Sequence, residues 1–594
     1  MADQLISEQQ PQANIEAQEP AEIWKKRHTA AHVMAQAVLE VFPDAKLAIG
    51  PPIEEGFYYD FDLPRSLTPD DLAGIESRMR RIQKADLPLA RSEKPRKEAL
   101  AYEEGRGQPY KTELIHDLPD GEAISFYTQG DFTDLCRGPH VASTGQIGVF
   151  KLDHTAGAYW RGDEKRPQLQ RIYGVLYDTQ EELDAYYVRL EEAKKRDHKV
   201  LGRQLGIFAN SAAVGSGLPL WLPKGAKLRQ VLERYVQDTE TEAGYDHVFT
   251  PDIAKVDLYK QSGHWEHYKD SMFPVMKTET EEYVLRPMNC PHHIQIYQND
   301  MHSYRDLPIR LAELGTMYRY EKSGELNGLE RVRAMTLSDA HIFCREDQVK
   351  EEVKSALLMV EAAYRKLGIG EYTYRLSLHD PKNTEKYVDN PGLWEQAEGE
   401  LSEVFSDLGL PFYEGLGEAA FYGPKIDIQL RNVLGREETV STIQVDRHLP
   451  AQFGLEYIGE DSQPHHPVMI HRGYISTMER LVAFLIEHYA GVFPTWLAPT
   501  QALVLPIADR HLEYANHVAG MLRKEGFRVD VDKRNESVRK KIAGAETQKV
   551  PYMLVVGDRD AAAGTVSPRK HGGQDLGGMA VADFLAHLQQ ETAA

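Results

Sequence analysis

The feature that most constrains the fold is a series of strand-like segments in the middle of the chain. The segment IRLAELGTMYRYE (309–321) predicts a strand that ends in Arg319, Tyr320 and Glu321, and VRAMTLSDAHIFC (332–344) predicts a second strand after a polar loop. The segment PVMIHRGYISTMER (467–480) predicts a strand, a turn and the start of a helix that carries Glu479 and Arg480. A short polar loop can join antiparallel strands, whereas parallel strands need a longer crossover. An antiparallel sheet is therefore predicted.

Patterns on both sides of this sheet predict a multidomain α+β chain. Residues 1–21 are polar and poor in aromatic residues, which is typical of a disordered tail. Residues 22–178 begin with an amphipathic helix that Pro43 ends, and short strands broken by Gly and Pro follow. Residues 179–200 are charged and helical, and residues 201–494 contain the antiparallel sheet. Strands and helices alternate in residues 495–594, which predicts a small α/β domain.

Composition narrows the class of protein. The net charge is −22, which argues against bulk polyanion binding but leaves local basic segments such as DKRNESVRKK available for nucleic acid. No apolar run is long enough to cross a membrane, and the N-terminus does not have the pattern of a secretory signal. Cys136, Cys290 and Cys344 are too few and too scattered for a disulfide framework. We expect a cytoplasmic protein.

Cys290 lies in the segment LRPMNCPHH (285–293), where a cysteine can be a buried apolar residue, a nucleophile or a metal ligand. Strand alternation in 332–344 puts Leu337, Asp339 and His341 on one face and Cys344 on the other. His341 and Cys344 therefore do not suit one ion. A set of Cys290, His341 and His471 would suit zinc with an open fourth position. Spacing alone leaves this set open, because the chain has 23 histidines.

Arginines near the two strands suggest a polyphosphate site. Arg319 and Glu321 are expected to share a face, and the following loop adds Arg331. Arginine binds phosphate oxygens in a bidentate manner, and Arg480 can stack on a base or contact a terminal phosphate. Taken singly, each of these residues fits a surface ion pair equally well.

Several motifs in the same order resemble a known family. The RYE segment, the SDAHIFC strand and the MER helix resemble motifs two and three of class II aminoacyl-tRNA synthetases, and YDHVFTPDI resembles motif one. Together with LRPMNCPHH, SGHWEHYKDSMF, FYGPKIDIQL and VMIHR, they are similar to the threonyl-tRNA synthetase family over nearly the whole chain from residue 22. The resemblance implies a class II antiparallel-sheet catalytic core.

The resemblance also implies roles for the core residues. It implies one Zn²⁺ per subunit on Cys290, His341 and His471, with Asp339, Tyr422 and Lys425 binding L-threonine. It implies that ATP, with Mg²⁺, is bound by Arg319, Glu321, Arg331, Met335, Gln444 and Arg480. Arg319, Glu321 and Arg480 would be the catalytic residues. A zinc ion that binds the substrate hydroxyl would reject valine strongly, but it cannot exclude serine well.

A second site is therefore expected in residues 22–178. The segment HTAAH places His28 and His32 on one helix face, and DLCRGPH contributes Asp134, Cys136 and His140. With Lys111 of QPYKTEL, these residues are similar to the domain that edits seryl-tRNA in bacterial-type threonyl enzymes. The three histidines and Cys136 would also suit a metal ion, so a metal site is the alternative interpretation of the same residues. The resemblance implies a metal-free editing site.

The C-terminal domain resembles the anticodon-binding domain of the threonyl, prolyl, histidyl and glycyl enzymes. The resemblance implies that Asn535 and Arg569 contact anticodon bases and that Lys533 and Arg534 contact phosphates. It also implies tRNA(Thr) as partner and a homodimer. The family usually has an N-terminal ubiquitin-like domain, which we expect to be missing here. Met335 and Leu337 depart from the family pattern, where an aromatic residue and a Gln are usual.

Three other functions fit parts of this pattern. A prolyl or seryl synthetase would share the class II motifs, but the Cys/His/His set favours the threonyl enzyme. A non-catalytic RNA-binding relative would be expected to lose Arg319, Glu321 or Arg480, and all three are present. An editing-only hydrolase would not need the intact activation motifs.

Overall fold

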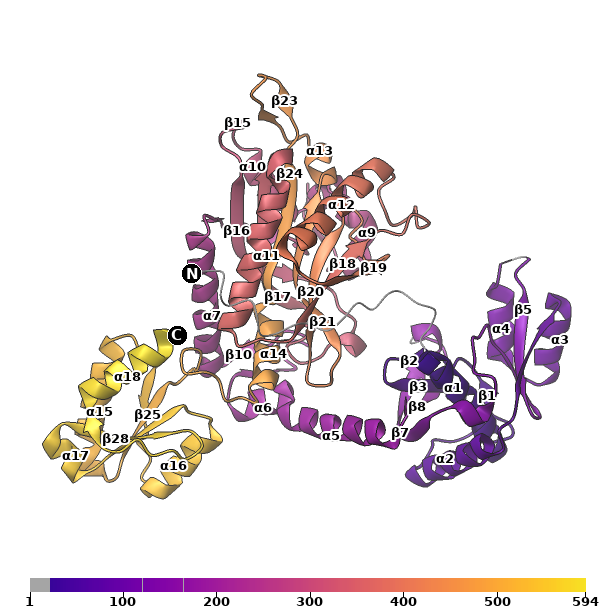
Figure 1. Cartoon of the computed structure of the whole chain (residues 1–594), viewed down its shortest axis with the longest axis horizontal. Coiled ribbons are helices and arrows are strands. Elements are labelled where there is room, and N and C mark those ends of the chain that lie inside the picture. Colours follow the sequence, from indigo (N-terminus) through magenta and orange to yellow (C-terminus); the bar gives the residue numbers. More distant parts are fainter. Residues whose placement is uncertain (1–21, 120, 164, 594) are drawn as a thin grey trace. The chain divides into compact units, whose positions relative to one another are not determined.

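The computed structural model describes residues 22–119, 121–163 and 165–593, which form two compact units that meet in the chain at residues 191 and 192 (Figure 1). The tail predicted at residues 1–21 lies outside the described residues. None of the helices in the described part of the chain is long and apolar enough to cross a membrane.

The first unit is built on two sheets. The larger has the order β1-β3-β8-β7, with β2 paired to β3. Helix α1 packs on β3 and on α2. The smaller has the order β4-β5-β6 and is accompanied by α3 and α4, which pack together. The bounds are α1 (Glu22–Val41), β1 (Lys46–Leu47), β2 (Pro52–Ile53), β3 (Gly56–Asp62), α2 (Pro69–Lys84), β4 (Leu89–Lys94), α3 (Arg96–Gly105), α4 (Pro109–Asp117), β5 (Ile124–Gln129), β6 (Phe132–Leu135), β7 (Val149–Tyr159) and β8 (Gln168–Tyr177).

Helix α1 is amphipathic in the way its sequence predicts. Ala30, Val33, Met34 and Ala37 are fully buried against the larger sheet, and the helix ends two residues before Pro43. The helix therefore fixes the direction in which the side chains of its buried face project.

The predicted connecting helix is in fact two helices. Helix α5 (Gln180–Arg196) ends before Asp197, and the Asp197 carboxylate accepts a hydrogen bond from the Lys199 amide at the start of α6 (His198–Gln204). Asp is favoured at such a position because its side chain satisfies an amide at the helix start that lacks an intrahelical partner.

The second unit contains the predicted antiparallel sheet. Its strand order is β11-β16-β17-β24-β21-β20-β18-β19, and the pairs are antiparallel except β11 with β16 and β18 with β19. The strands are β11 (Asp246–His247), β16 (Ile309–Tyr318), β17 (Ala334–Cys344), β18 (Tyr372–Leu378), β19 (Phe412–Leu416), β20 (Lys425–Arg431), β21 (Glu437–Asp446) and β24 (Val468–Thr477). Helices α7 (Pro223–Glu242), α11 (Val349–Lys366), α12 (Pro391–Leu408) and α14 (Met478–His488) share one hydrophobic core with it.

Two boundaries differ from the sequence prediction. Strand β16 ends at Tyr318, and the Glu321 amide donates to the Arg319 carbonyl, so Arg319 and Glu321 lie in a turn and not on a strand face. Strand β24 continues without a turn to Thr477, whose hydroxyl accepts from the Arg480 amide and caps α14.

The last part of the chain forms the predicted α/β arrangement. The strand order is β26-β25-β27-β28-β29, with β25 parallel to both β26 and β27. The bounds are β25 (Ala502–Pro506), α15 (Leu512–Lys524), β26 (Val529–Val531), α16 (Val538–Thr547), β27 (Tyr552–Val556), α17 (Asp558–Ala563), β28 (Thr565–Lys570), β29 (Met579–Ala580) and α18 (Val581–Ala593).

Candidate functional site

Strand register brings the core candidates into one row across the sheet. His341 of β17 is directly opposite His471 of β24, and His471 is opposite Gln444 of β21. Gln444 is in turn opposite Lys425 of β20. Directly opposed residues project from the same face of a sheet. Four residues from distant parts of the sequence therefore line one face.

Cys290 joins this row from outside the sheet. It begins α10 (Cys290–Tyr297), and its sulfur, His341 and His471 offer ligand atoms within 4.8 Å of one another. Nε2 of His341 is 3.1 Å from Nδ1 of His471. Cys344 is buried in the main core, away from this group, as strand alternation predicts.

The remaining ring nitrogens are held by other side chains. His471 Nε2 is 2.9 Å from a carboxylate oxygen of Asp446, and His341 Nδ1 is 2.8 Å from Nδ1 of His293. Such partners orient metal-binding imidazoles and select the tautomer that presents a lone pair. Burial lowers the pKa of His341, which keeps its ring neutral. The donor set and its surroundings fit zinc.

Three other residues singled out from the sequence, Asp339, Tyr422 and Lys425, lie in or beside this row. Asp339 lies two residues before His341 on the same strand face, and burial raises its pKa to about 6. Tyr422 stacks on the His471 ring with centroids 5.0 Å apart and donates a hydrogen bond to Gln444. Lys425 forms an ion pair with Asp427 at 2.9 Å.

The candidate arginines come from the end of β16, from the loop that follows it and from the start of α14, directly after β24. Arg319 directly follows β16, and its Nε is buried without a hydrogen-bond partner among the described residues. Glu321 is bound by Arg331 through an ion pair of 2.8 Å. Arg480 at the start of α14 donates to the Glu330 carbonyl at 3.3 Å. Met335 is half-buried on β17.

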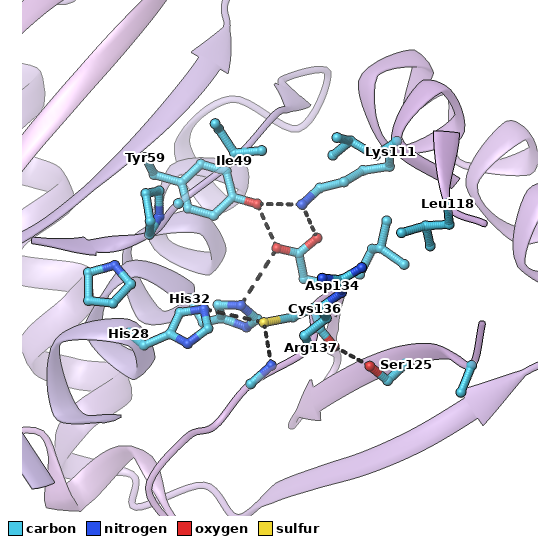
Figure 2. A pocket seen from close by; sticks show the side chains of 17 residues that line it. His28, His32, Ile49, Tyr59, Lys111, Leu118, Ser125, Asp134, Cys136 and Arg137 are labelled. Carbon is cyan, nitrogen blue, oxygen red and sulfur yellow. Dashed lines mark hydrogen bonds and ion pairs between the residues drawn. The ribbon is translucent and has the colours of Figure 1, made fainter. Parts of the chain in front are cut away.

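The second candidate site is in the first unit, where a cavity of about 520 Å³ is lined by residues from both sheets and from α1 and α4 (Figure 2). Asp134 at the end of β6 forms an ion pair of 2.7 Å with Lys111, and its other oxygen accepts from the Tyr59 hydroxyl at 2.6 Å. Lys111 also donates to Tyr59 at 2.9 Å. These three side chains are nearly fully buried.

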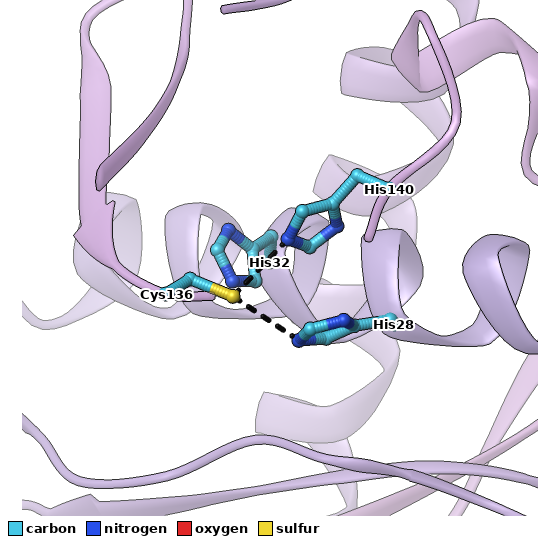
Figure 3. A group of neighbouring side chains, drawn as sticks. All are labelled: His28, His32, Cys136 and His140. Carbon is cyan, nitrogen blue, oxygen red and sulfur yellow. Dashed lines mark hydrogen bonds between the residues drawn. The ribbon is translucent and has the colours of Figure 1, made fainter. Parts of the chain in front are cut away.

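The histidines and the cysteine converge beside this network (Figure 3). The Cys136 sulfur is 3.3 Å from Nε2 of His28 and 3.3 Å from Nε2 of His140. With His32, they form a group whose ligand atoms lie within 4.8 Å of one another and which could hold a metal ion. Burial raises the pKa of the Cys136 thiol to about 11 and depresses the pKa of the three histidines. At neutral pH the site presents a thiol and neutral imidazoles.

Four contributing residues were missed from sequence. Tyr59, His293 and Asp446 supply hydrogen bonds described above, and His264 Nε2 is 3.5 Å from the Cys290 sulfur. His264 and His293 stand inside SGHWEHYKDSMF and LRPMNCPHH, two of the motifs that carry the resemblance, so these motifs could have indicated them. Tyr59 is in a strand with no such motif.

The two predicted anticodon residues are not brought together by any contact. Asn535 is exposed between β26 and α16. Arg569 of β28 pairs with Asp575 at 3.2 Å.

Comparisons with known proteins agree with this geometry. Residues 273–489 match the tRNA synthetase class II core domain (G, H, P, S and T), residues 501–591 match an anticodon binding domain, and residues 124–173 match the threonyl and alanyl tRNA synthetase second additional domain. The core and its site define a class II aminoacyl-tRNA synthetase.

Relatives identify the family within this class. The chain is 55% identical over 566 residues to a threonine–tRNA ligase of Geobacillus sp. strain WCH70, with 95% of this chain and 88% of the relative covered. It is 54% identical over 568 residues to the threonine–tRNA ligase of Halalkalibacterium halodurans, with the same coverage. The chain belongs to the threonine–tRNA ligase family.

Solved structures show the same fold over about two thirds of the chain. The RNA binding domain of threonyl-tRNA synthetase from Cryptosporidium parvum Iowa II has a TM-score of 0.64 and 36% identity, covering 66% of this chain and 98% of that one. A putative threonyl-tRNA synthetase from Aeropyrum pernix has a TM-score of 0.59 and 28% identity, covering 67% and 96%.

Proposed function

We propose that this chain is an ATP-dependent ligase that joins L-threonine to tRNA(Thr) and hydrolyses mischarged seryl-tRNA(Thr). The observation that carries the proposal is the row His341, His471 and Gln444 across the sheet, with Cys290 against it. We assign editing to residues 22–178, a linker to 179–200, catalysis to 201–494 and anticodon binding to 495–594.

Cys290, His341 and His471 would hold one zinc ion. When bound, zinc would act as a Lewis acid that can accept both the amine and the hydroxyl of threonine. Asp339 would accept a hydrogen bond from the ammonium or hydroxyl group, and Tyr422 and Lys425 would complete the amino-acid pocket. Valine is isosteric with threonine but has no hydroxyl, so it would leave this polar site unsatisfied and be rejected.

The arginines are suited to the ATP phosphates. Arg319 is the best candidate for the α-phosphate, because its buried Nε has no hydrogen-bond partner among the described side chains and main chain. A threonine carboxylate oxygen attacks the α-phosphorus in line and pyrophosphate leaves, after which a hydroxyl of the tRNA 3′ adenosine attacks the acyl carbonyl and releases AMP. Arg331 and Arg480 would hold the remaining phosphates with Mg²⁺, and Glu321, Met335 and Gln444 the nucleoside.

Hydrolysis of the seryl ester would use water and not the thiol. The Cys136 pKa of about 11 keeps the sulfur protonated at neutral pH, whereas the neutral imidazoles of His28, His32 and His140 can accept a hydrogen bond from the attacking water and orient it. Lys111 and Asp134 form a buried charged pair beside them, which offers polar groups to the serine moiety. We assign this cluster to editing without metal.

Anticodon contacts and dimerisation are further parts of the proposal. Asn535 and Arg569, with Lys533 and Arg534, would contact the anticodon loop. A homodimer is supported by exposed apolar side chains near motif one: Phe249 is 88% exposed, and Ile253 and Met276 lie on a small sheet of β12 (Ile253–Lys255), β14 (Glu282–Leu285) and β13 (Met276–Lys277) with 45% and 41% exposure.

The test of the metal assignment compares two cysteine variants. Cys290→Ala should lose the bound zinc and threonine-dependent ATP–pyrophosphate exchange. Cys344→Ala is the matched control, because Cys344 is also buried but is outside the ligand group. We expect about one zinc per chain in the wild type and in the control. Exchange by a zinc-free Cys290→Ala enzyme would refute the assignment, and undiminished zinc content in that variant would show that Cys290 is not needed to hold the metal.

The editing assignment has its own test. His32→Ala should let seryl-tRNA(Thr) accumulate while threonine activation stays at the wild-type rate. Clearance of seryl-tRNA at an unchanged rate in this variant would remove editing from the proposal and leave the ligase activity standing.

A further inference from the structure

The loop between β16 and β17 (residues 319–333) is held by helices outside the sheet. This loop carries Glu321 and Arg331, which the proposed function places on ATP. Two side chains from outside the loop bind its middle. Lys199 Nζ donates to the Asn327 side chain at 2.9 Å, and Arg480 donates to the Glu330 carbonyl at 3.3 Å. These tethers come from α6 and α14, which contact each other.

His198 of α6 makes the most buried of these contacts. Its ring is 1% exposed. Nδ1 is 2.8 Å from a carboxylate oxygen of Glu487 on α14, and Nε2 accepts the Leu329 amide at 3.1 Å. The His198 amide donates to the same Glu487 oxygen at 3.2 Å. Because Nε2 accepts a hydrogen bond, the ring proton must be on Nδ1. The Glu487 carboxylate is placed to accept the hydrogen bond that Nδ1–H donates.

This arrangement distinguishes a clamp from a metal site. Asp197, His198 and Glu487 offer ligand atoms within 4.8 Å of one another. However, Nε2 of His198 is already occupied by an amide and Nδ1 by a carboxylate. The imidazole therefore has no lone pair left for an ion.

The loop backbone is shaped to fit the ring. Gly328 has φ +51°, and a Cβ at this position would lie 2.1 Å from His198 Nε2. Leu329 next to it is fully buried in the main core. A glycine is required here both by the positive φ and by the close approach of the imidazole. Ring and loop form one packed unit.

We propose that His198 is a positioning residue for ATP: held by Glu487, its Nε2 fixes the Leu329 amide and so preorganises the loop that presents Arg331 and Glu321. The inference rests on the proposed function for the role of those two residues. The threonine pocket is on β17, β20, β21 and β24, so loss of the clamp should act on ATP and leave threonine binding nearly unchanged.

Two isosteric variants separate the two ring contacts. In His198→Asn the amide nitrogen can replace Nδ1 toward Glu487, but the acceptor for Leu329 is lost. In His198→Gln the amide oxygen can replace Nε2 toward Leu329, while the contact to Glu487 is lost. One lost hydrogen bond to a buried amide should raise KM for ATP roughly fivefold to tenfold in His198→Asn. His198→Gln should remain within about twofold of the wild type, as should KM for threonine in both variants.

Hydrogen exchange provides a readout that needs no activity. In the full-length protein without substrates, peptides covering residues 326–333 should exchange faster in His198→Asn than in His198→Gln, and the peptides of β17 should not change. If His198→Asn fails to fold, Gly328→Ala serves as the variant without the Leu329 contact, because the added Cβ would push the loop away from the His198 ring. The same faster exchange of residues 326–333 is expected.

The outcomes separate this inference from the proposed function. The clamp would be overturned if the two variants had equal KM values for ATP and equal hydrogen exchange in residues 326–333. A parallel rise in KM for ATP and threonine would also overturn it and indicate a general structural role. A wild-type chain without threonine-dependent ATP–pyrophosphate exchange would refute the proposed function. The hydrogen-exchange data would still show whether His198 orders the loop.

Discussion

The ion pair of Lys111 with Asp134 gives a quantitative test of the editing site. Its Nζ–Oδ1 distance is 2.7 Å, and the two side chains are 4% and 2% exposed. Lys111→Met would leave the carboxylate with the Tyr59 hydroxyl at 2.6 Å and the His32 ring at 3.9 Å. Removing one partner of a buried ion pair typically costs about 3–5 kcal/mol, because the other charge stays buried and unpaired.

The double variant Lys111→Met/Asp134→Asn removes that unpaired charge. Since replacing both partners of a buried pair is often nearly neutral, the double variant should lose at most about 1–2 kcal/mol. Hydrogen exchange of the amides in β5 measures the free energy of opening for this unit in the full-length chain. A double variant that loses as much stability as Lys111→Met, or more, would refute the reasoning.

Three further predictions concern other buried groups. Burial raises the pKa of Glu103 from 4.5 to about 7. Between these two pH values the folded unit binds more protons than the unfolded chain, so its free energy of unfolding falls as pH rises. Glu103→Gln should stabilise the unit by up to about 3 kcal/mol at pH 8 and by nothing at pH 4, measured by exchange of α3 amides at both pH values. Arg472→Met should destabilise the catalytic core by about 3–5 kcal/mol in urea unfolding, because Glu240 would lose its buried partner; an unchanged midpoint would contradict this. Gly315→Ala would place a Cβ 2.2 Å from the Asn289 side chain, next to Cys290, so zinc should be lost to a chelator about tenfold more readily.

Much of the sheet could be predicted because its strands have a clear period of two. Alternation in β17 correctly separated His341 from Cys344, and polar segments marked the loop after β16. The alternation of strands and helices after residue 495 likewise predicted the last domain. Hydrophobic periodicity is strong where one face packs against helices, as it does in these segments.

Register and partners could not be predicted in this way. The pairing of His341 with His471, and of His471 with Gln444, depends on how strands far apart in sequence align, and no local pattern encodes that alignment. Tyr59 was missed for the same reason, because its partners Lys111 and Asp134 come from other segments. The break at Asp197 was missed because charged residues on both sides continue a helical pattern.

The wide sequence separation of Cys290, His341 and His471 has a consequence for biosynthesis. A nascent chain on the ribosome cannot assemble these ligands until β24 has emerged and paired with β17. An ion bound there would therefore stabilise a catalytic core that is already nearly complete and would not nucleate its early folding.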